Sequence, residues 1–376
     1  MPENDLLMPR RTIDLDPDGI TSPPRATFVE LGVASCFSFL RGASDAVDLA
    51  LQARALGYDA LGIADANSMA GVVRLHSEAR TLKLRPVIGC RIELAEGLAF
   101  LAYPRDRAAY GRLCRLISAG RMGKLDGEWQ DKGACDISLA MLADHAEGVQ
   151  LVLLPPDDLA HQFTLEVEDN VVPLSLAGGP APGPGSGSGS GPSSKHVGRR
   201  ILAALADLLP HLVRQLPTMR HIAASYLYRG DDVARIERLD ALARANGLAI
   251  LATNDVHYHA PDRRPLQDVM TAIRHKTTVA AAGHLLHANA ERYLKSPAQM
   301  EHLFARWPHA IHAARAVADG CTFRLEELSY EYPREIYPDG MDPQEYLEQQ
   351  TWAGSQWRYP NGLPQSVEDV LERELA

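Results

Sequence analysis

The chain has 376 residues, of which 46% are hydrophobic and 23% charged, and its formal net charge is −10. These proportions are those of a folded globular protein and exclude a wholly disordered chain. The negative net charge also excludes a protein that binds nucleic acid over most of its surface, but it is compatible with a local basic face. The five cysteines form no CxxC pair, which favours a reducing cytoplasm over a disulfide framework or a zinc ribbon.

Two segments differ from this globular composition. Residues 1–27 carry charges and prolines without the apolar core of a signal peptide, and we expect a flexible tail there. Residues 178–194, GGPAPGPGSGSGSGPSS, are predicted to form a linker or a loop insertion, because Gly and Ser lose much entropy on ordering and nothing apolar is available to bury. The same pattern on both sides favours an insertion within one domain. No run approaches 18 apolar residues, so no membrane span is expected.

Strand-like apolar runs alternate with segments of helical period as far as about residue 276. We expect strands at residues 28–33, 60–64, 86–94, 99–103, 149–154, 221–226 and 249–253. Helices are predicted at residues 45–56, 69–84, 105–120, 201–216 and 232–246. The first helix has Ser44 as its N-cap and Gly57 as its stop signal. About seven strands separated by helices predict a parallel α/β fold, either a barrel or a doubly wound sheet, with its chemistry at the carboxyl ends of the strands.

Two regions are less regular. The strands at 86–94 and 99–103 are also compatible with a hairpin around residues 95–97. After about Lys276 the alternation stops, and residues 296–306, 310–320 and 343–355 have helical patterns. We therefore place a domain boundary near residue 285, between an α/β domain at 28–285 and a mainly α-helical extension at 286–376.

A polar cluster follows the last predicted strand. If the strand geometry continues, Asp255, His257 and His259 alternate onto one face. Their oxygen and nitrogen atoms are suited to a metal ion. The alternative is that Asp255 hydrogen-bonds the following turn and that the histidines are half-exposed before Pro261.

Asp65 and Cys90 end two other predicted strands. Asp65 is suited to be a general base or a metal ligand, and equally to accept hydrogen bonds from the helix near Met69. Cys90 has no histidine near it in the sequence, and we interpret it as a buried filler. We interpret the basic stretch at residues 105–124 as a solvated helix face, with phosphate contact as the alternative.

Four segments resemble the successive motifs of a PHP domain, the polymerase and histidinol phosphatase fold that begins the bacterial C-family DNA polymerases. They are FVELGVASCFSFLRG (28–42), ALGYDALGIADANSMAG (55–71), PVIGCR (86–91) and ATNDVHY (252–258). Further segments resemble a narrower group, the error-prone DNA polymerases of damage-induced translesion synthesis. They lie at residues 103–117, 228–232, 287–292 and 328–333.

This resemblance implies a distorted seven-stranded (β/α) barrel, in which strand-end His, Asp, Glu and Cys residues hold a metal cluster in active members. Gly32 and Ala34 occupy the His positions of the first motif, and Arg91 occupies the Glu position of the third. The residues that match the ligand pattern are Asp65, Asp255 and His257. So few donors beside a cation disfavour divalent ions. We therefore interpret these three as remnants of a degenerate metal site, and the barrel as a structural module without a cofactor.

The resemblance also implies that the polymerase chemistry lies outside this chain. Family members hold two magnesium ions on palm carboxylates, which we expect beyond residue 376. No catalytic residue is therefore assigned here, residues 286–376 are the start of the polymerase region, and the chain alone is expected to be inactive. The implied parent is a cytoplasmic DNA polymerase that acts on primed template DNA and deoxynucleoside triphosphates, with the sliding clamp and other translesion proteins as partners. A metal-dependent PHP phosphoesterase and a non-catalytic scaffold are the alternatives.

Overall fold

A computed structural model describes residues 19–167, 199–329, 337–338 and 340–375. The chain divides into two compact units, Met1–Glu327 and Leu328–Ala376. The first is an α/β unit, and the second contains the helices α10 (Pro343–Arg358) and α11 (Gln365–Leu375). The Gly/Ser/Pro-rich segment at 178–194 and most of the predicted tail lie outside the described residues. None of the helices in the described ranges is both long and apolar enough to span a bilayer.

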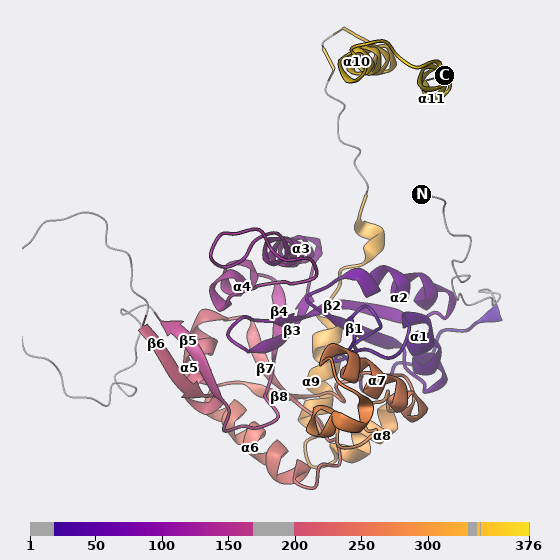
Figure 1. Ribbon diagram of the computed structural model, residues 1–376. Helices are drawn as coiled ribbons and strands as arrows, with labels where there is room; N and C mark the ends of the chain where they lie inside the picture. Colours follow the sequence, from indigo (N-terminus) through magenta and orange to yellow (C-terminus); the bar gives the residue numbers. More distant parts are fainter. Residues whose placement is uncertain (1–18, 168–198, 330–336, 339, 376) are drawn as a thin grey trace, which may run out of the picture. The chain divides into compact units, whose positions relative to one another are not determined.

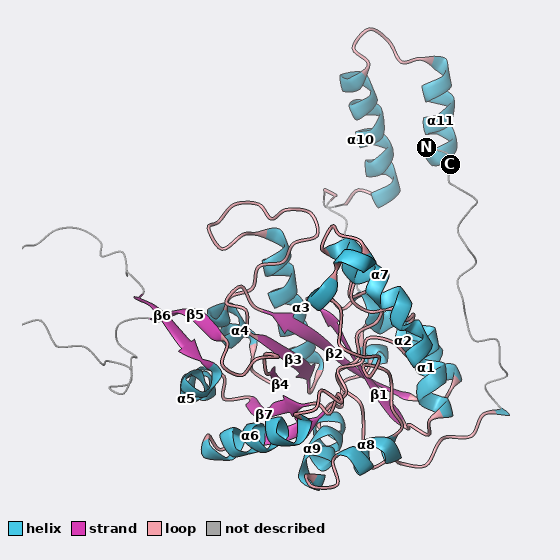
Figure 2. Cartoon of the chain, turned by 60° about the horizontal axis from the view of Figure 1, so that its bottom comes forward, coloured by secondary structure: helices cyan, strands magenta, loops and turns pink. Residues whose placement is uncertain are grey.

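A six-stranded sheet forms the centre of the first unit, with helices around it (Figure 2). Its strands follow one another across the sheet in the order β1 (Ala60–Ala66), β2 (Arg85–Glu93), β3 (Ala99–Pro104), β4 (Val149–Leu154), β7 (Met219–Ala224) and β8 (Ala249–Ala252). The pairs β1–β2, β4–β7 and β7–β8 are parallel. Six of the seven predicted strands are therefore present in the sheet.

The sheet is not parallel throughout, because β3 runs antiparallel to both β2 and β4. The connection from β2 to β3 spans only residues 94–98, too short for a parallel crossover, which needs a dozen residues or more. Gly97 takes a φ of 85° in this turn, a conformation that glycine adopts without steric cost. The alternative of a hairpin around residues 95–97 is thus confirmed.

The predicted first strand, residues 28–33, is extended but joins no ladder. Its backbone lies beside β1, where the N–H groups of Gly62 and Ala64 donate to the carbonyls of Glu30 and Val33 at 2.8 Å each. On its other side the N–H of Val256, just after β8, donates to the carbonyl of Gly32 at 2.6 Å. Isolated backbone hydrogen bonds therefore connect this segment to β1 on one side and to the residues after β8 on the other. The fold is a distorted α/β fold in which, among the described residues, the ladder of strands does not close into a continuous barrel.

The helices of the first unit follow the predicted order with shifted ends. They are α1 (Ala46–Ala55), α2 (Ala70–Thr81), α3 (Arg107–Met122), α4 (Leu139–His145), α5 (Leu205–Gln215), α6 (Asp232–Ala245), α7 (Arg264–Arg274), α8 (Pro297–Leu303) and α9 (Pro308–Asp319). The N-cap of α1 is Asp45, not Ser44, because the Asp45 carboxylate accepts a hydrogen bond from the Val47 N–H. Gly57 does follow α1, with a φ of 87°.

A second, two-stranded sheet was not predicted. It pairs β5 (Gln162–Val167) with β6 (Arg199–Ala204) in antiparallel register, at one side of the unit next to α5 (Figure 1). The helix expected from residue 201 therefore begins only at Leu205. The two strands pair with each other, so the chain returns after residues 168–198 to the place that it left.

The hydrophobic core continues past residue 285. Phe304, Trp307 and Ile311 belong to the same buried cluster as Phe28 and Leu61, and α9 packs against β8. Helices α8 and α9 thus lie within the first compact unit. The assignment of residues 286–376 to the start of a polymerase region is not decided by this packing and stays a prediction.

Gly32 permits the close approach of the extended segment to the end of β8. A Cβ atom at Gly32 would lie 2.3 Å from Thr253 Oγ1 and 3.3 Å from Glu30 Oε1. These atoms belong to a buried network in which Glu30 accepts hydrogen bonds from the Gly32 N–H, the Thr253 hydroxyl and the Asn254 N–H. We expect Gly32→Ala to lower the free energy of unfolding by about 1–3 kcal/mol, the usual cost of overpacking, as measured by urea denaturation.

Gly111→Ala is the matched control. Gly111 lies inside α3, where the added Cβ would meet only Arg115 Nη2 at 3.7 Å, so helix propensity should stabilise the chain by up to about 1 kcal/mol. Equal stability of the Gly32→Ala variant and the unmodified chain would show that the segment does not pack this tightly.

Candidate functional site at the carboxyl ends of the strands

Polar residues gather where the parallel strands end. Arg91 lies near the end of β2, Asp157 follows β4, Ser225 follows β7, and Asp255 and His257 follow β8. All five line one cavity of about 280 Å³. This is the edge at which α/β folds place their ligands, as the strand pattern predicts.

The carboxylate of Asp255 is held by two arginines. Arg91 Nη1 lies 3.2 Å from Asp255 Oδ1, and Arg292 Nη1 is hydrogen-bonded to Asp255 Oδ2. Burial alone would raise the pKa of Asp255, but Arg292 and then Arg91 hold it far below its usual range. Both oxygen atoms of Asp255 are therefore engaged by fixed cations.

The prediction that Asp255, His257 and His259 share one face is wrong for His259. Strand β8 ends at Ala252 and Asp255 has a φ of 46°, so the alternation of a strand does not continue. His257 Nε2 remains near Asp255 Oδ1, at 3.8 Å. The Nδ1 atom of His259 instead lies 2.8 Å from the hydroxyl oxygen of Ser44.

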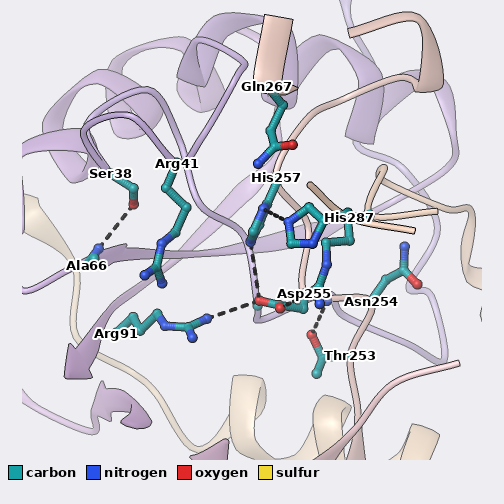
Figure 3. A network of polar contacts seen from close by, with 12 residues as sticks. Ser38, Arg41, Ala66, Arg91, Thr253, Asn254, Asp255, His257, Gln267 and His287 are labelled. Carbon is teal, nitrogen blue, oxygen red and sulfur yellow. Dashed lines mark hydrogen bonds and ion pairs between the residues drawn. The ribbon is translucent and has the colours of Figure 1, made fainter. Parts of the chain in front are cut away.

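A second histidine, His287, lies beside His257. The distance between His287 Nε2 and His257 Nδ1 is 3.3 Å (Figure 3). Burial lowers the pKa of both rings, that of His287 to about 4, with Arg292 adding to the effect. The two imidazoles are therefore neutral at pH 7.

Asp65 makes its contacts with a loop. Its carboxylate accepts hydrogen bonds from the N–H and hydroxyl of Ser35 and from the hydroxyl of Ser38, at 2.7 to 3.0 Å. Helix α2 has no side-chain cap at its N-terminus, so Asp65 does not cap that helix. Burial raises the pKa of Asp65. Its observed role is to fix the loop at residues 35–38 against β1.

Arg91 also connects Asp255 with a second carboxylate. Its Nε lies 3.0 Å from Glu93 Oε1, and Arg41 Nη1 lies 2.5 Å from the same oxygen. Figure 3 shows Arg41 and Arg91 extending to the same side of Asp255. Arg91 thus lies beside the polar residues that end β8, as its motif position implies.

These residues do not fit a cluster of divalent metal ions. The oxygens of Asp255 are occupied by arginines and those of Asp65 by serines, and in the described ranges no group of three or more His, Cys, Asp and Glu residues is placed to hold a metal ion. A histidine at position 32, where the motif would have one, would bring its Cβ within 2.3 Å of Thr253 Oγ1. The interpretation of Asp65, Asp255 and His257 as remnants of a metal site stays a prediction.

Arg41, His287 and Arg292 are among the residues of the site that were not found from the sequence. Arg41 lies in the loop after the first extended segment, and His287 and Arg292 follow the expected boundary at 285. The only signal for the last two was that residues 287–292 resemble a segment of the error-prone polymerases. Local sequence patterns do not reveal which loop residues reach the site. Arg292 and Asp255, for example, are 37 residues apart in the sequence, and their contact depends on the fold.

The other candidates lie apart from this network. Cys90 is fully buried, and burial raises the pKa of its thiol, so a reactive thiolate is not favoured. In the basic stretch, Arg112 pairs with Glu147 at 2.9 Å and Lys124 with Asp131 at 3.2 Å. Arg121 donates to the Asn67 carbonyl at 2.7 Å. These arginine and lysine side chains therefore make contacts within the protein.

Removal of the central carboxylate should destabilise the chain. In Asp255→Asn, Arg91 and Arg292 would lose their shared counter-ion, and we expect the free energy of unfolding at pH 7 to fall by about 2–4 kcal/mol. Breaking a fully buried ion pair costs about 3–5 kcal/mol, and the Asp255 side chain is 22% exposed. The control Glu237→Gln breaks an exposed pair with Arg306 and should change the value by less than about 1 kcal/mol.

The same variant has an expected pH dependence. In the unfolded chain an aspartate titrates near pH 4, whereas the folded state keeps Asp255 ionised to lower pH. Its contribution to stability is therefore complete above about pH 4 and is lost as the pH falls below that value. Urea unfolding between about pH 4 and pH 2.5 should show a larger loss for the unmodified chain than for Asp255→Asn; parallel curves would contradict the assignment.

Comparison with known proteins identifies relatives of this chain. Residues 30–172 match the family model described as PHP domain. The chain is 40% identical over 354 residues to "Error-prone DNA polymerase 1" of Agrobacterium fabrum, and 36% identical over 357 residues to "Error-prone DNA polymerase" of Caulobacter vibrioides. Each match covers 94% of this chain and 28% of the relative. The solved structure of an amidohydrolase from Chromobacterium violaceum is 12% identical and aligns with a TM-score of 0.39, over 61% of this chain and 87% of that chain.

The chain thus spans about 28% of the length of the curated relatives that it matches. The family match agrees with the motifs read from the sequence, and the matches to the polymerases extend far beyond it along the chain. Residues 30–172 therefore match a PHP domain, and the chain is similar over most of its length to the error-prone DNA polymerases, as its motifs predict.

Proposed function

We propose that this chain is the N-terminal part of an error-prone DNA polymerase that acts in damage-induced translesion synthesis in the cytoplasm. The observation that carries the proposal is the extent of the polymerase matches, which cover 94% of the chain and not only the PHP region at 30–172. In this proposal the substrates are primed template DNA and deoxynucleoside triphosphates. Magnesium and the nucleotidyl-transfer carboxylates belong to a region outside the chain, and the sliding clamp and other translesion proteins are its partners.

The PHP unit has a structural role in this proposal. The two carboxylates at the strand ends, Asp255 and Asp65, bind arginine and serine side chains, and their lone pairs are used within the protein. A metal-dependent phosphoesterase would need these oxygens for its ions, so the arrangement disfavours that alternative. A scaffold without any link to DNA synthesis is disfavoured by the relatives.

Primer extension tests the proposal. The 376-residue chain with magnesium, primed template and four deoxynucleotides is expected to add no nucleotide, because in this proposal the nucleotidyl-transfer carboxylates lie outside the chain. A chimera that carries residues 28–376 in place of the matched segment of the Agrobacterium relative should extend primers within about tenfold of that relative's rate. Incorporation by the highly purified chain alone, or an inactive chimera that is folded, would contradict the proposal.

Elemental analysis tests the structural role of the PHP unit. We expect the purified chain to contain no stoichiometric zinc, iron or manganese, and Arg91→Glu, which restores the carboxylate of the motif, serves as the comparison. Two or three metal ions per unmodified chain would overturn the assignment. One weakly held ion on Asp255 and His257 would not, because a single weak site is not a metal cluster.

A further inference from the structure

Six arginines line the cavity at the carboxyl ends of the strands. The arginines are Arg41, Arg91, Arg229, Arg235, Arg274 and Arg292, and the carboxylates facing them are Asp157 and Asp255. Glu93 adds a third carboxylate through its contacts with Arg41 and Arg91. Among the described residues, the six arginines of the cavity therefore outnumber its two lining carboxylates and the neighbouring Glu93.

The carboxylates of this cavity are shared between cations. Glu93 Oε1 serves both Arg41 and Arg91, and Asp255 serves both Arg91 and Arg292. A guanidinium group has five N–H donors, so donors remain for a further acceptor. Burial and the neighbouring Arg91 lower the pKa of Arg41.

Four of the lining arginines are held in place. The side chains of Arg292, Arg91 and Arg41 are only 8%, 19% and 21% exposed. The guanidinium of Arg235 donates to the backbone carbonyls of Pro156 and Asp157, at 2.5 and 2.8 Å, and no described carboxylate pairs with it. A site of this kind loses little conformational entropy when it binds an anion.

We propose that this cavity binds a phosphoryl group without a metal ion, either as a free phosphate or as the terminal phosphate of a nucleic-acid strand. Guanidinium forks match phosphate oxygens in bidentate pairs, and a dianion supplies most of the missing negative charge. The volume of about 280 Å³ lies just below the range of about 300–1,000 Å³ for drug-sized ligands. It therefore has room for a phosphate group.

Isothermal titration calorimetry with inorganic phosphate tests the proposal on the 376-residue chain. EDTA is present throughout, and sodium chloride at matched ionic strength controls for screening. We expect saturable binding of one phosphate per chain and a melting temperature that rises with phosphate concentration. Because the inference concerns binding by the chain itself, its outcome is independent of primer extension.

Variants locate the bound phosphate. Arg41→Gln should weaken binding about tenfold or more, the loss expected for a charge-assisted hydrogen bond, and Arg41→Lys should weaken it less. The control Arg112→Gln changes an arginine on α3 that pairs with Glu147 outside the cavity, and its affinity should equal that of the unmodified chain. Circular dichroism checks folding. Arg274→Gln, at an exposed position that lines the cavity, provides a second test if Arg41→Gln does not fold.

Two oligonucleotides distinguish the sources of the phosphoryl group. Binding at least about tenfold tighter for a 5′-phosphorylated strand than for its 5′-hydroxyl counterpart, with competition by free phosphate, assigns the site to a strand terminus. Equal binding of the two strands, together with saturable binding of free phosphate, assigns it to a free anion. The proposal is overturned if phosphate and the 5′-phosphorylated strand have no effect beyond that of chloride, or if folded Arg41→Gln and Arg274→Gln bind as tightly as the unmodified chain.

Discussion

The functional edge of this protein depends on one carboxylate. Asp255 sits where β8 ends, and its two oxygens bind an arginine from β2 and an arginine from the loop near residue 292. Three parts of the chain are thereby tied together by charge at a place where backbone hydrogen bonds are few. A carboxylate that is mostly buried between cations is stable only while both partners remain, because each charge alone would be costly to desolvate. The geometry of Arg91, His257 and Arg292 follows from this requirement.

A second constraint acts behind that carboxylate. The extended segment at residues 28–34 passes between β1 and the end of β8, and it lies so close that position 32 has no room for a side chain. Buried Glu30 holds the turn after β8 through Thr253 and Asn254, and the hydroxyl of Tyr103 donates to the carbonyl of Leu31. The hydrogen bonds of Glu30 and Tyr103 therefore support the backbone that carries Asp255. A ligand side chain cannot be added to this segment without disturbing that support.

The fixed charges at the carboxyl ends of the strands determine which ions can bind there. A metal cluster needs several free carboxylates and imidazoles, whereas this edge has carboxylates already bound to guanidinium groups. Fixed arginines still attract oxyanions, and they do so without the pH-dependent loading of a metal ion. The cavity at these strand ends is thus lined by covalently attached cations.

The sequence by itself determined the elements whose signals are local. Hydrophobic periodicity and stop signals located six of the seven expected strands and the main helices, including the end of α1 at Gly57. The motifs identified the family and implied that Arg91 lies beside the end of β8. Local patterns left the direction of β3 open, and they did not reveal the pairing of β5 with β6 or the choice of Asp45 over Ser44 as cap. Only the tertiary structure decided that His259 turns away to Ser44 and that Arg41, His287 and Arg292 join the site. The physical reason is distance along the chain: Arg91 and Asp255 are 164 residues apart, and a contact of that length depends on strand order and loop path, which no local period encodes.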